Sequence, residues 1–170
     1  QIRQLEKPVL AAVNGAVSGA ALGIVLACDL RIASERARFV VGFTSIGLTT
    51  DSAVSLFLPS LIGVGRATEA AFDNTAINAE QALVWGLVNR LVPSSELTDQ
   101  AIKWANNLAQ GPMQAYGLTK RAFNKAVFSN LEQVLDYEAH LQDIARRGAE
   151  HKEGVGAFLE KRSPDFIAHS

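Results

Sequence analysis

A run of small and apolar residues near the start of the chain most constrains its fold. Residues 18–28, SGAALGIVLAC, hold no charge, and they follow a short apolar stretch at residues 9–13 and the break Asn14-Gly15. This order predicts a buried strand, a turn and a buried helix that begins at about Gly19. The run is too short to span a bilayer, so we expect a core helix.

The rest of the chain predicts an α/β body followed by a helical region. We expect further strands at residues 30–33, 38–41 and 87–92, and helices at 51–61, 66–72 and 79–85. After Pro93 only helices are expected, at residues 97–110, 113–128, 131–147 and 153–159. The pattern therefore predicts a core at residues 1–95 that carries the site, and a helical C-terminal region at 96–170.

Composition narrows the functional classes. The chain has 170 residues, 48% hydrophobic and 19% charged, with a net charge of -1. This indicates a globular protein and gives no reason to expect nucleic acid or an anionic membrane as partner. Cys28 is the one cysteine and lies in an apolar run, so we interpret it as a buried thiol, and the three histidines lack metal-ligand spacing. A polar start without a visible signal peptide leads us to expect a cytoplasmic protein.

The start of the helix after Gly19 is a candidate binding site for an oxygen that becomes negatively charged. The first N–H groups of a helix have no intrahelical acceptor, and the helix dipole adds partial positive charge there. Glycine and alanine let a ligand approach this backbone closely. A thioester oxygen that turns anionic would suit the place. From spacing alone, tight packing of a buried helix on a sheet explains the small residues better.

Five segments, in order and over nearly the whole chain, resemble the crotonase (enoyl-CoA hydratase/isomerase) family. The most specific is KPVLAAVNGAVSGAALGIVLACDLRIASERARF at residues 7–39. The others are LPSLIGVGRATEA (58–70), INAEQALVWGLVNRLVP (77–93), GPMQAYGLTKRAF (111–123) and EGVGAFLEKRSPDF (153–166).

The resemblance implies a spiral of ββα units with a trimerising helical C-terminus, acyl-CoA substrates and a homotrimer or hexamer. It implies two backbone N–H donors around the thioester oxygen. One falls at Ala20, where the family usually has glycine, beside Gly19. The other would come from a segment upstream of Gln1, so we expect that an N-terminal portion precedes this sequence. Coenzyme A enters as part of the substrate, and no metal or redox cofactor is implied.

The sequence departs from the family where hydratases carry two glutamates that handle water. These positions fall at Gly23 and Phe43, neither of which can transfer a proton. Asp51 is the candidate replacement: some isomerases of the family and the 4-chlorobenzoyl-CoA dehalogenases resemble this chain in carrying an aspartate there. It would shuttle a proton in an isomerase and attack an aromatic ring in a dehalogenase. The dehalogenases have a tryptophan where Phe43 stands. Without the resemblance, an N-cap at the head of helix 51–61 is the better explanation of Asp51.

Two residues near the C-terminus, Phe158 and Lys161, lie in a segment that resembles the one by which the family reaches CoA from a neighbouring subunit. Lysine suits a phosphate group, and so do Arg66 and Lys120, although a solvated helix surface explains each of them as well. The sequence therefore favours an acyl-CoA isomerase with Asp51 as base. A hydratase with unusual acid–base residues, a dehalogenase-like hydrolase and a non-catalytic acyl-CoA-binding protein stay open.

Overall fold

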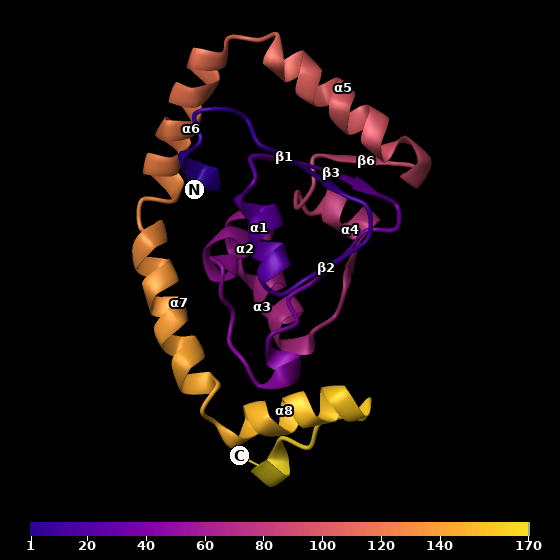
Figure 1. The fold of residues 1–170 in the computed structure, drawn as a ribbon, viewed down its shortest axis with the longest axis vertical. Helices are drawn as coiled ribbons and strands as arrows, with labels where there is room; N and C mark the ends of the chain where they lie inside the picture. Colours follow the sequence, from indigo (N-terminus) through magenta and orange to yellow (C-terminus); the bar gives the residue numbers. More distant parts are fainter. Residues whose placement is uncertain (170) are drawn as a thin grey trace.

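The structure, a computed structural model, describes residues 1–169. An α/β body comes first and a series of helices second, as predicted (Figure 1). The strands of the body are β1 (Leu10–Val13), β2 (Ala16–Ser18), β3 (Leu30–Ser34), β4 (Arg38–Val40), β5 (Ile77–Asn78) and β6 (Arg90–Val92). Its helices are α1 (Ala20–Ala27), α2 (Val54–Ile62), α3 (Val64–Asp73) and α4 (Ala79–Val84), and the C-terminal helices are α5 (Leu97–Ala109), α6 (Met113–Val127), α7 (Leu131–Ala145) and α8 (Ala149–Glu160).

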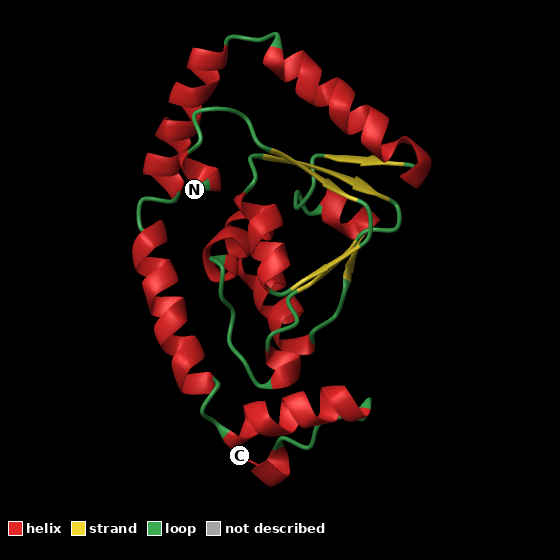
Figure 2. Ribbon diagram, in the orientation of Figure 1, coloured by secondary structure: helices red, strands yellow, loops and turns green. Residues whose placement is uncertain are grey.

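The six strands form two small sheets (Figure 2). In the first, β3 lies between β1 and β6, all parallel, with Leu10 opposite Leu30 and Ile32 opposite Arg90. In the second, β4 lies between parallel β2 and antiparallel β5. Helix α1 connects β2 of one sheet to β3 of the other, so its first residue lies where the chain leaves the second sheet.

The core lies between the sheets and helices α1 to α4. Large apolar side chains with almost no exposure meet there: Leu22 and Leu26 of α1, Phe39 of β4, and Phe57 and Leu58 of α2. Because α1 is apolar on every side, part of it has no core to enter, and Ile24 is 59% exposed.

The C-terminal helices run end to end around the outside of the body (Figure 1). Helix α5 contacts β1 and β3, α6 contacts the N-terminal turn Ile2–Gln4, and α7 contacts α2. Helix α8 contacts the 3-10 turn Thr44–Ile46, with Gly154 against the backbone of Ile46. Among the described residues no helix is both long and apolar enough to cross a membrane.

Several boundaries differ from those expected. Strands β2 and β5 escaped prediction because they have only three and two residues. Helix α8 starts at Ala149, four residues before the expected position, since polar residues of its first turn hide the apolar periodicity. Helix α2 starts at Val54, after two residues with positive φ, Ser52 (56°) and Ala53 (60°). Asp51 therefore precedes the helix and is not its N-cap, so that interpretation was wrong.

Candidate active site

The start of α1 is built by a glycine turn that leaves the first helical amide at the surface. Gly19 has φ 59° and donates its N–H to the carbonyl of Val41 at 3.2 Å, which ties the turn to the end of β4. Ala20 is exposed and is the first residue of the helix. In this turn the N–H of Leu22 donates to the carbonyl of Gly19, at 2.9 Å. The amide of Ala20 lies at the positive end of the helix dipole, where a backbone N–H has no acceptor within the helix.

Phe43 lies beside this turn and is almost fully buried. A Cβ built on Gly19 would lie 3.8 Å from the tip of the Phe43 ring, so the two predicted residues are neighbours. Phe43 follows Gly42, whose φ of 78° turns the chain out of β4. Its ring is 6% exposed and offers an apolar surface under the start of α1, with no group that exchanges protons.

Asp51 lies in the loop between the 3-10 turn and α2, and it is partly exposed. Its Oδ1 accepts a hydrogen bond from the hydroxyl of Ser52 at 2.9 Å, and its Oδ2 accepts one from the side-chain Nε2 of Gln142 in α7 at 3.0 Å. The carboxylate borders an open hollow of about 440 Å³ between this loop and α7. A carboxylate has about four lone-pair positions, so further positions are available to accept a proton.

Gly23 of α1 is the residue at which the helix packs against this loop. A Cβ at Gly23 would lie 2.5 Å from Cβ of Ser52 and would overlap the Ser52 carbonyl oxygen. Gly23 lies three residues after Ala20, which places it on the same face of α1 and about 4.5 Å further along the axis. The residue that follows Asp51 therefore packs one helical turn away from Ala20.

Two residues of α7 that were not predicted from the sequence, Gln142 and Glu138, hold this loop. The buried carboxylate of Glu138 accepts hydrogen bonds from the amides of Ala53 (2.7 Å) and Ser55 (3.1 Å) and from the Ser55 hydroxyl (2.5 Å). Glu138 thus caps α2 from another helix. It occupies a position of the inward-facing stripe of α7, between Val134 and Leu141 at helical spacing. A glutamate on that stripe was the signal available in the sequence.

A second hollow, of about 490 Å³, runs along α1 beside the first. Its lining is mostly apolar, and both hollows share Ser52 and Leu135. It is lined by Gln1, Ile2, Arg3, Gln4, Gly23, Ile24, Ala27, Ser52, Ala53, Phe57, Leu131, Glu132 and Leu135. Asp51 lines the first hollow and the exposed Ile24 the second, so a carboxylate and an apolar channel adjoin at Ser52.

The remaining predicted site residues lie elsewhere. Phe158 is 74% exposed on α8, and Lys161 is the exposed residue that ends this helix, with φ 56°. No described contact joins either of them to Ala20 or Asp51. Arg66 is exposed on α3 and stacks over the ring of Trp85, with its guanidinium carbon 5.1 Å from the ring centre.

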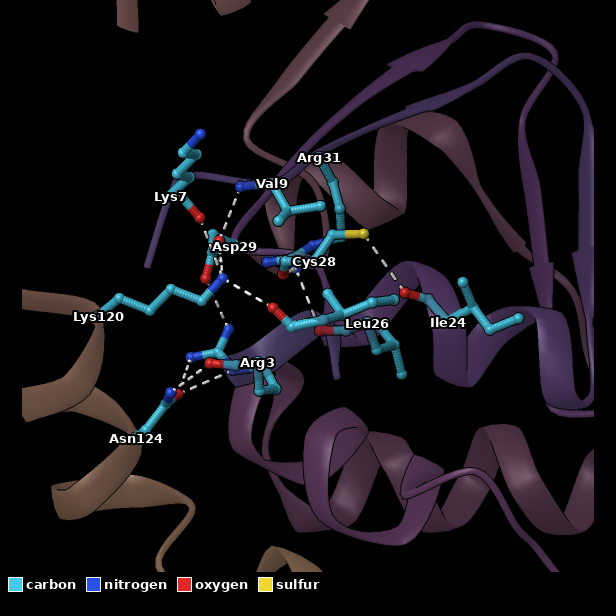
Figure 3. Close-up of polar contacts among 11 residues, drawn as sticks. Arg3, Lys7, Val9, Ile24, Leu26, Cys28, Asp29, Arg31, Lys120 and Asn124 are labelled. Atoms are coloured by element: carbon cyan, nitrogen blue, oxygen red, sulfur yellow. Dashed lines mark hydrogen bonds and ion pairs between the residues drawn. The ribbon is translucent and has the colours of Figure 1, made fainter. Parts of the chain in front are cut away.

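Lys120 is neither a solvated surface residue nor a free phosphate ligand. It is 7% exposed, and its Nζ donates to Asp29 at 2.7 Å and to the carbonyl of Ile2 at 2.9 Å (Figure 3). Arg3 donates to the other oxygen of Asp29 at 3.0 Å, and Asp29 also accepts from the amide of Val9. These ion pairs fasten α6 to the body, which corrects both interpretations of Lys120.

Cys28 is buried beside this cluster, as expected. Burial raises the pKa of its thiol; the nearby Arg31 guanidinium opposes that rise and Asp29 adds to it. Burial has the opposite effect on the cation of Arg31, whose pKa it lowers. Arg31 donates hydrogen bonds to the carbonyls of Leu87 and Cys28. A thiol with a raised pKa is a poor nucleophile. Among the described residues, no group of three or more His, Cys, Asp or Glu side chains is arranged to hold a metal ion.

Comparison with known proteins identifies the family. The family model described as enoyl-CoA hydratase/isomerase matches residues 1–169. The chain is 40% identical over 166 residues to a 1,2-epoxyphenylacetyl-CoA isomerase of Escherichia coli (strain K12), covering 98% of this chain and 63% of that protein. It is 35% identical over 161 residues to 4-chlorobenzoyl coenzyme A dehalogenase-1 of an Arthrobacter species, covering 94% of this chain and 58% of that protein.

The fold agrees with this. A crystal structure of an enoyl-CoA hydratase from Mycobacterium avium subsp. paratuberculosis K-10 superposes with a TM-score of 0.94 at 36% identity, over 97% of this chain and 67% of that one. The expected crotonase fold is confirmed, and the chain spans a little under two thirds of the length of the curated relatives described above. The chain belongs to the enoyl-CoA hydratase/isomerase family.

Proposed function

We propose that this chain carries the active site of an acyl-CoA isomerase in which Ala20 and Asp51 are the catalytic residues. The observation that carries the proposal is the packing of Ser52 on Gly23. It places the neighbour of the Asp51 carboxylate one turn along α1 from the Ala20 amide. A base and an oxyanion donor within reach of one acyl group are what enolate chemistry requires.

The reaction would move a proton between two carbons of the acyl group. The Ala20 N–H donates to the thioester oxygen, which acidifies the α-carbon. The Asp51 carboxylate takes the α-proton, and the electron pair of the C–H bond becomes the enolate, with its charge on the oxygen that faces Ala20. Asp51 then returns the proton to the γ-carbon, and the double bond shifts from the 3- to the 2-position. No electron leaves the substrate, so the chemistry requires no redox cofactor.

The packing at Gly23 argues against a hydratase with two glutamates. A side chain at this position would overlap the Ser52 carbonyl, so the loop before α2 fills the space that the first glutamate would need. The second position is held by the buried ring of Phe43. Water activation by a pair of carboxylates therefore has no support at either place.

A dehalogenase-like hydrolase is the second candidate. The likeness to the Arthrobacter dehalogenase and the carboxylate of Asp51 favour it, because a carboxylate can attack an electron-poor aromatic ring. Phe43 lacks the indole N–H that the resemblance to the dehalogenases leads us to expect at this position. The dehalogenase-like function is therefore placed after the isomerase. Thioester binding without turnover is the third candidate.

The acyl group would extend along α1, from Gly19 and the neighbouring Phe43 ring toward the 490 Å³ hollow that Gly23 and Ile24 line. We further propose that residues 96–170 serve oligomerisation into a homotrimer or hexamer. Exposed apolar side chains along these helices support this, among them Phe123, Phe158 and Leu159. Phe158 and Lys161 would then meet the CoA of a neighbouring subunit in a cytoplasmic enzyme.

A substrate panel tests the proposal. The full-length native protein is assayed with a 3-enoyl-CoA, crotonyl-CoA and a 4-halobenzoyl-CoA, alongside its Asp51→Ala variant. We expect isomerisation of the 3-enoyl-CoA to be the fastest reaction and to be lost in the variant. Halide release would establish the dehalogenase, hydration of crotonyl-CoA alone would establish the hydratase, and binding without any turnover would establish the non-catalytic protein.

A further inference from the structure

We propose that Gln142 of α7 is a positioning residue that aims the Asp51 carboxylate at the substrate. The inference rests on the proposed function, since it assigns a role to the base described there. Gln142 lies 91 positions after Asp51, on a helix outside the α/β body, and its Nε2 donates to Oδ2 of Asp51 at 3.0 Å. It is the α7 side chain that hydrogen-bonds to this carboxylate among the described contacts.

The amide of Gln142 can be oriented in one way only. Its Oε1 accepts a hydrogen bond from the backbone N–H of Thr49 at 3.3 Å, and an N–H can meet only the oxygen end of the amide. The NH₂ end is thereby directed to Asp51, whose ionised carboxylate can only accept. One side chain therefore joins both ends of the segment from Thr49 to Asp51 and fixes the rotation of the carboxylate.

The backbone after Asp51 adopts unfavourable conformations, and contacts from α7 hold it in place. Ser52 and Ala53 both adopt the left-handed conformation, which is unfavourable for residues with a Cβ. The amide of Ala53 donates to Glu138, one helical turn before Gln142 on the same face of α7. Glu138 thus fixes the backbone of the turn, while Gln142 fixes the functional side chain.

The role of Gln142 follows from the hydrogen bonds that the carboxylate makes. Ser52 donates to Oδ1 and Gln142 to Oδ2, so each oxygen has one donor from the protein. Without Gln142, rotation about the side-chain bonds of Asp51 would be limited by Ser52 alone. A proton-transferring group that is misplaced by about 1 Å can lose about 100-fold in rate. Substrate binding would be unaffected, because the proposed acyl channel does not include Gln142.

The test compares Gln142→Leu and Gln142→Glu, each alone and combined with Asp51→Asn, in the full-length protein. Leucine keeps the bulk and removes the donor, whereas glutamate keeps the shape and replaces the donor with a second acceptor. We expect both single variants to lower kcat for a 3-enoyl-CoA about 10- to 100-fold with KM nearly unchanged. In the Asp51→Asn background, with product collected over hours, neither change should lower turnover further, because residues that act through one another are not additive.

The matched control is Gln133→Leu, the same substitution at an exposed position of α7, which should keep the parent kcat. Unchanged kcat in both Gln142 variants would overturn the inference, as would losses that multiply with that of Asp51→Asn or that appear in KM. If Asp51→Asn alone kept parental turnover, the base assignment of the proposed function would fail and this inference with it. Failure of the base assignment can be told apart from failure of the Gln142 inference, because it is measured in Asp51→Asn alone, with Gln142 unchanged.

Discussion

Gly23 of α1 packs directly on the main chain of Ser52, with no space between them for a side chain. A Cβ at Gly23 would overlap the Ser52 carbonyl oxygen, a backbone atom that cannot turn aside as a flexible side chain would. The helix that offers the Ala20 amide and the loop that carries Asp51 therefore depend on each other for their positions.

Substitution of Gly23 by alanine tests this contact. Forced overpacking of a core site typically costs about 1–3 kcal/mol, and we expect a loss of that size in the free energy of unfolding measured with denaturant. Because the loop must move away from α1, isomerase turnover should fall as well. The control is Gly65→Ala in α3, where a Cβ meets open space and should stabilise the helix slightly. Equal stabilities for the Gly23 variant and the parent would contradict the packing.

Glu138→Gln tests the cap that α7 provides to α2. The buried carboxylate accepts three hydrogen bonds, and an amide turns one acceptor into a donor that faces other donors. Loss of bonds to a buried charged group costs about 1–3 kcal/mol, which a denaturant titration would register. Glu132→Gln, at an exposed position of the same helix, should leave stability unchanged. If both variants unfolded at the same denaturant concentration, Glu138 would not act as the cap.

Lys120→Met tests the ion-pair cluster that fastens α6. Methionine keeps the apolar stem and removes the ammonium that Asp29 and two backbone carbonyls share. Arg3 remains with Asp29, so we expect a loss of about 1–3 kcal/mol in the free energy of unfolding and no complete unfolding. Lys125→Met, on an exposed part of the same helix, serves as the control. If Lys120 were solvated, the Lys120 and Lys125 variants would have equal free energies of unfolding.

Cys28 gives a pH dependence of stability. Burial raises the pKa of its thiol, so the folded protein holds this proton to higher pH than the unfolded chain does. The contribution is present in full below the ordinary thiol pKa of about 8.5 and is lost as pH rises through the folded value. The unfolding free energy of the parent should therefore fall more steeply above about pH 8.5 than that of Cys28→Ala. Parallel pH curves would show that Cys28 does not titrate as proposed.

The order of elements could be predicted from the sequence because long apolar patterns decide it. The run at residues 18–28 and the three amphipathic patterns after Pro93 gave α1 and α5 to α7 to within two residues at each end. Short strands could not be found this way: β2 and β5 are set by their pairing with β4, which is a tertiary contact. The expected start of α2 was wrong because its cap comes from Glu138, far away in the sequence.

The proximity of candidate site residues could be predicted only for residues close together in the sequence. Gly19, Ala20 and Phe43 follow the ends of strands β2 and β4, which pair with each other and are separated by one helix and one strand in the sequence. Gln142 and Glu138 lie 83 to 93 positions after the residues they bind, and no local pattern connects them to Asp51. Lys120 was misinterpreted for the same reason, because its partner Asp29 is 91 positions away.

The central claim is that Asp51 moves a proton on an acyl-CoA whose carbonyl faces the Ala20 amide. Its most direct test is exchange of the α-proton of a saturated or 3-enoyl acyl-CoA in deuterated water, followed by NMR, for the native protein and Asp51→Asn. The account predicts rapid exchange in the native protein and a loss of at least about 100-fold in the variant, with binding of the CoA ester retained. Exchange at the native rate in Asp51→Asn would contradict it.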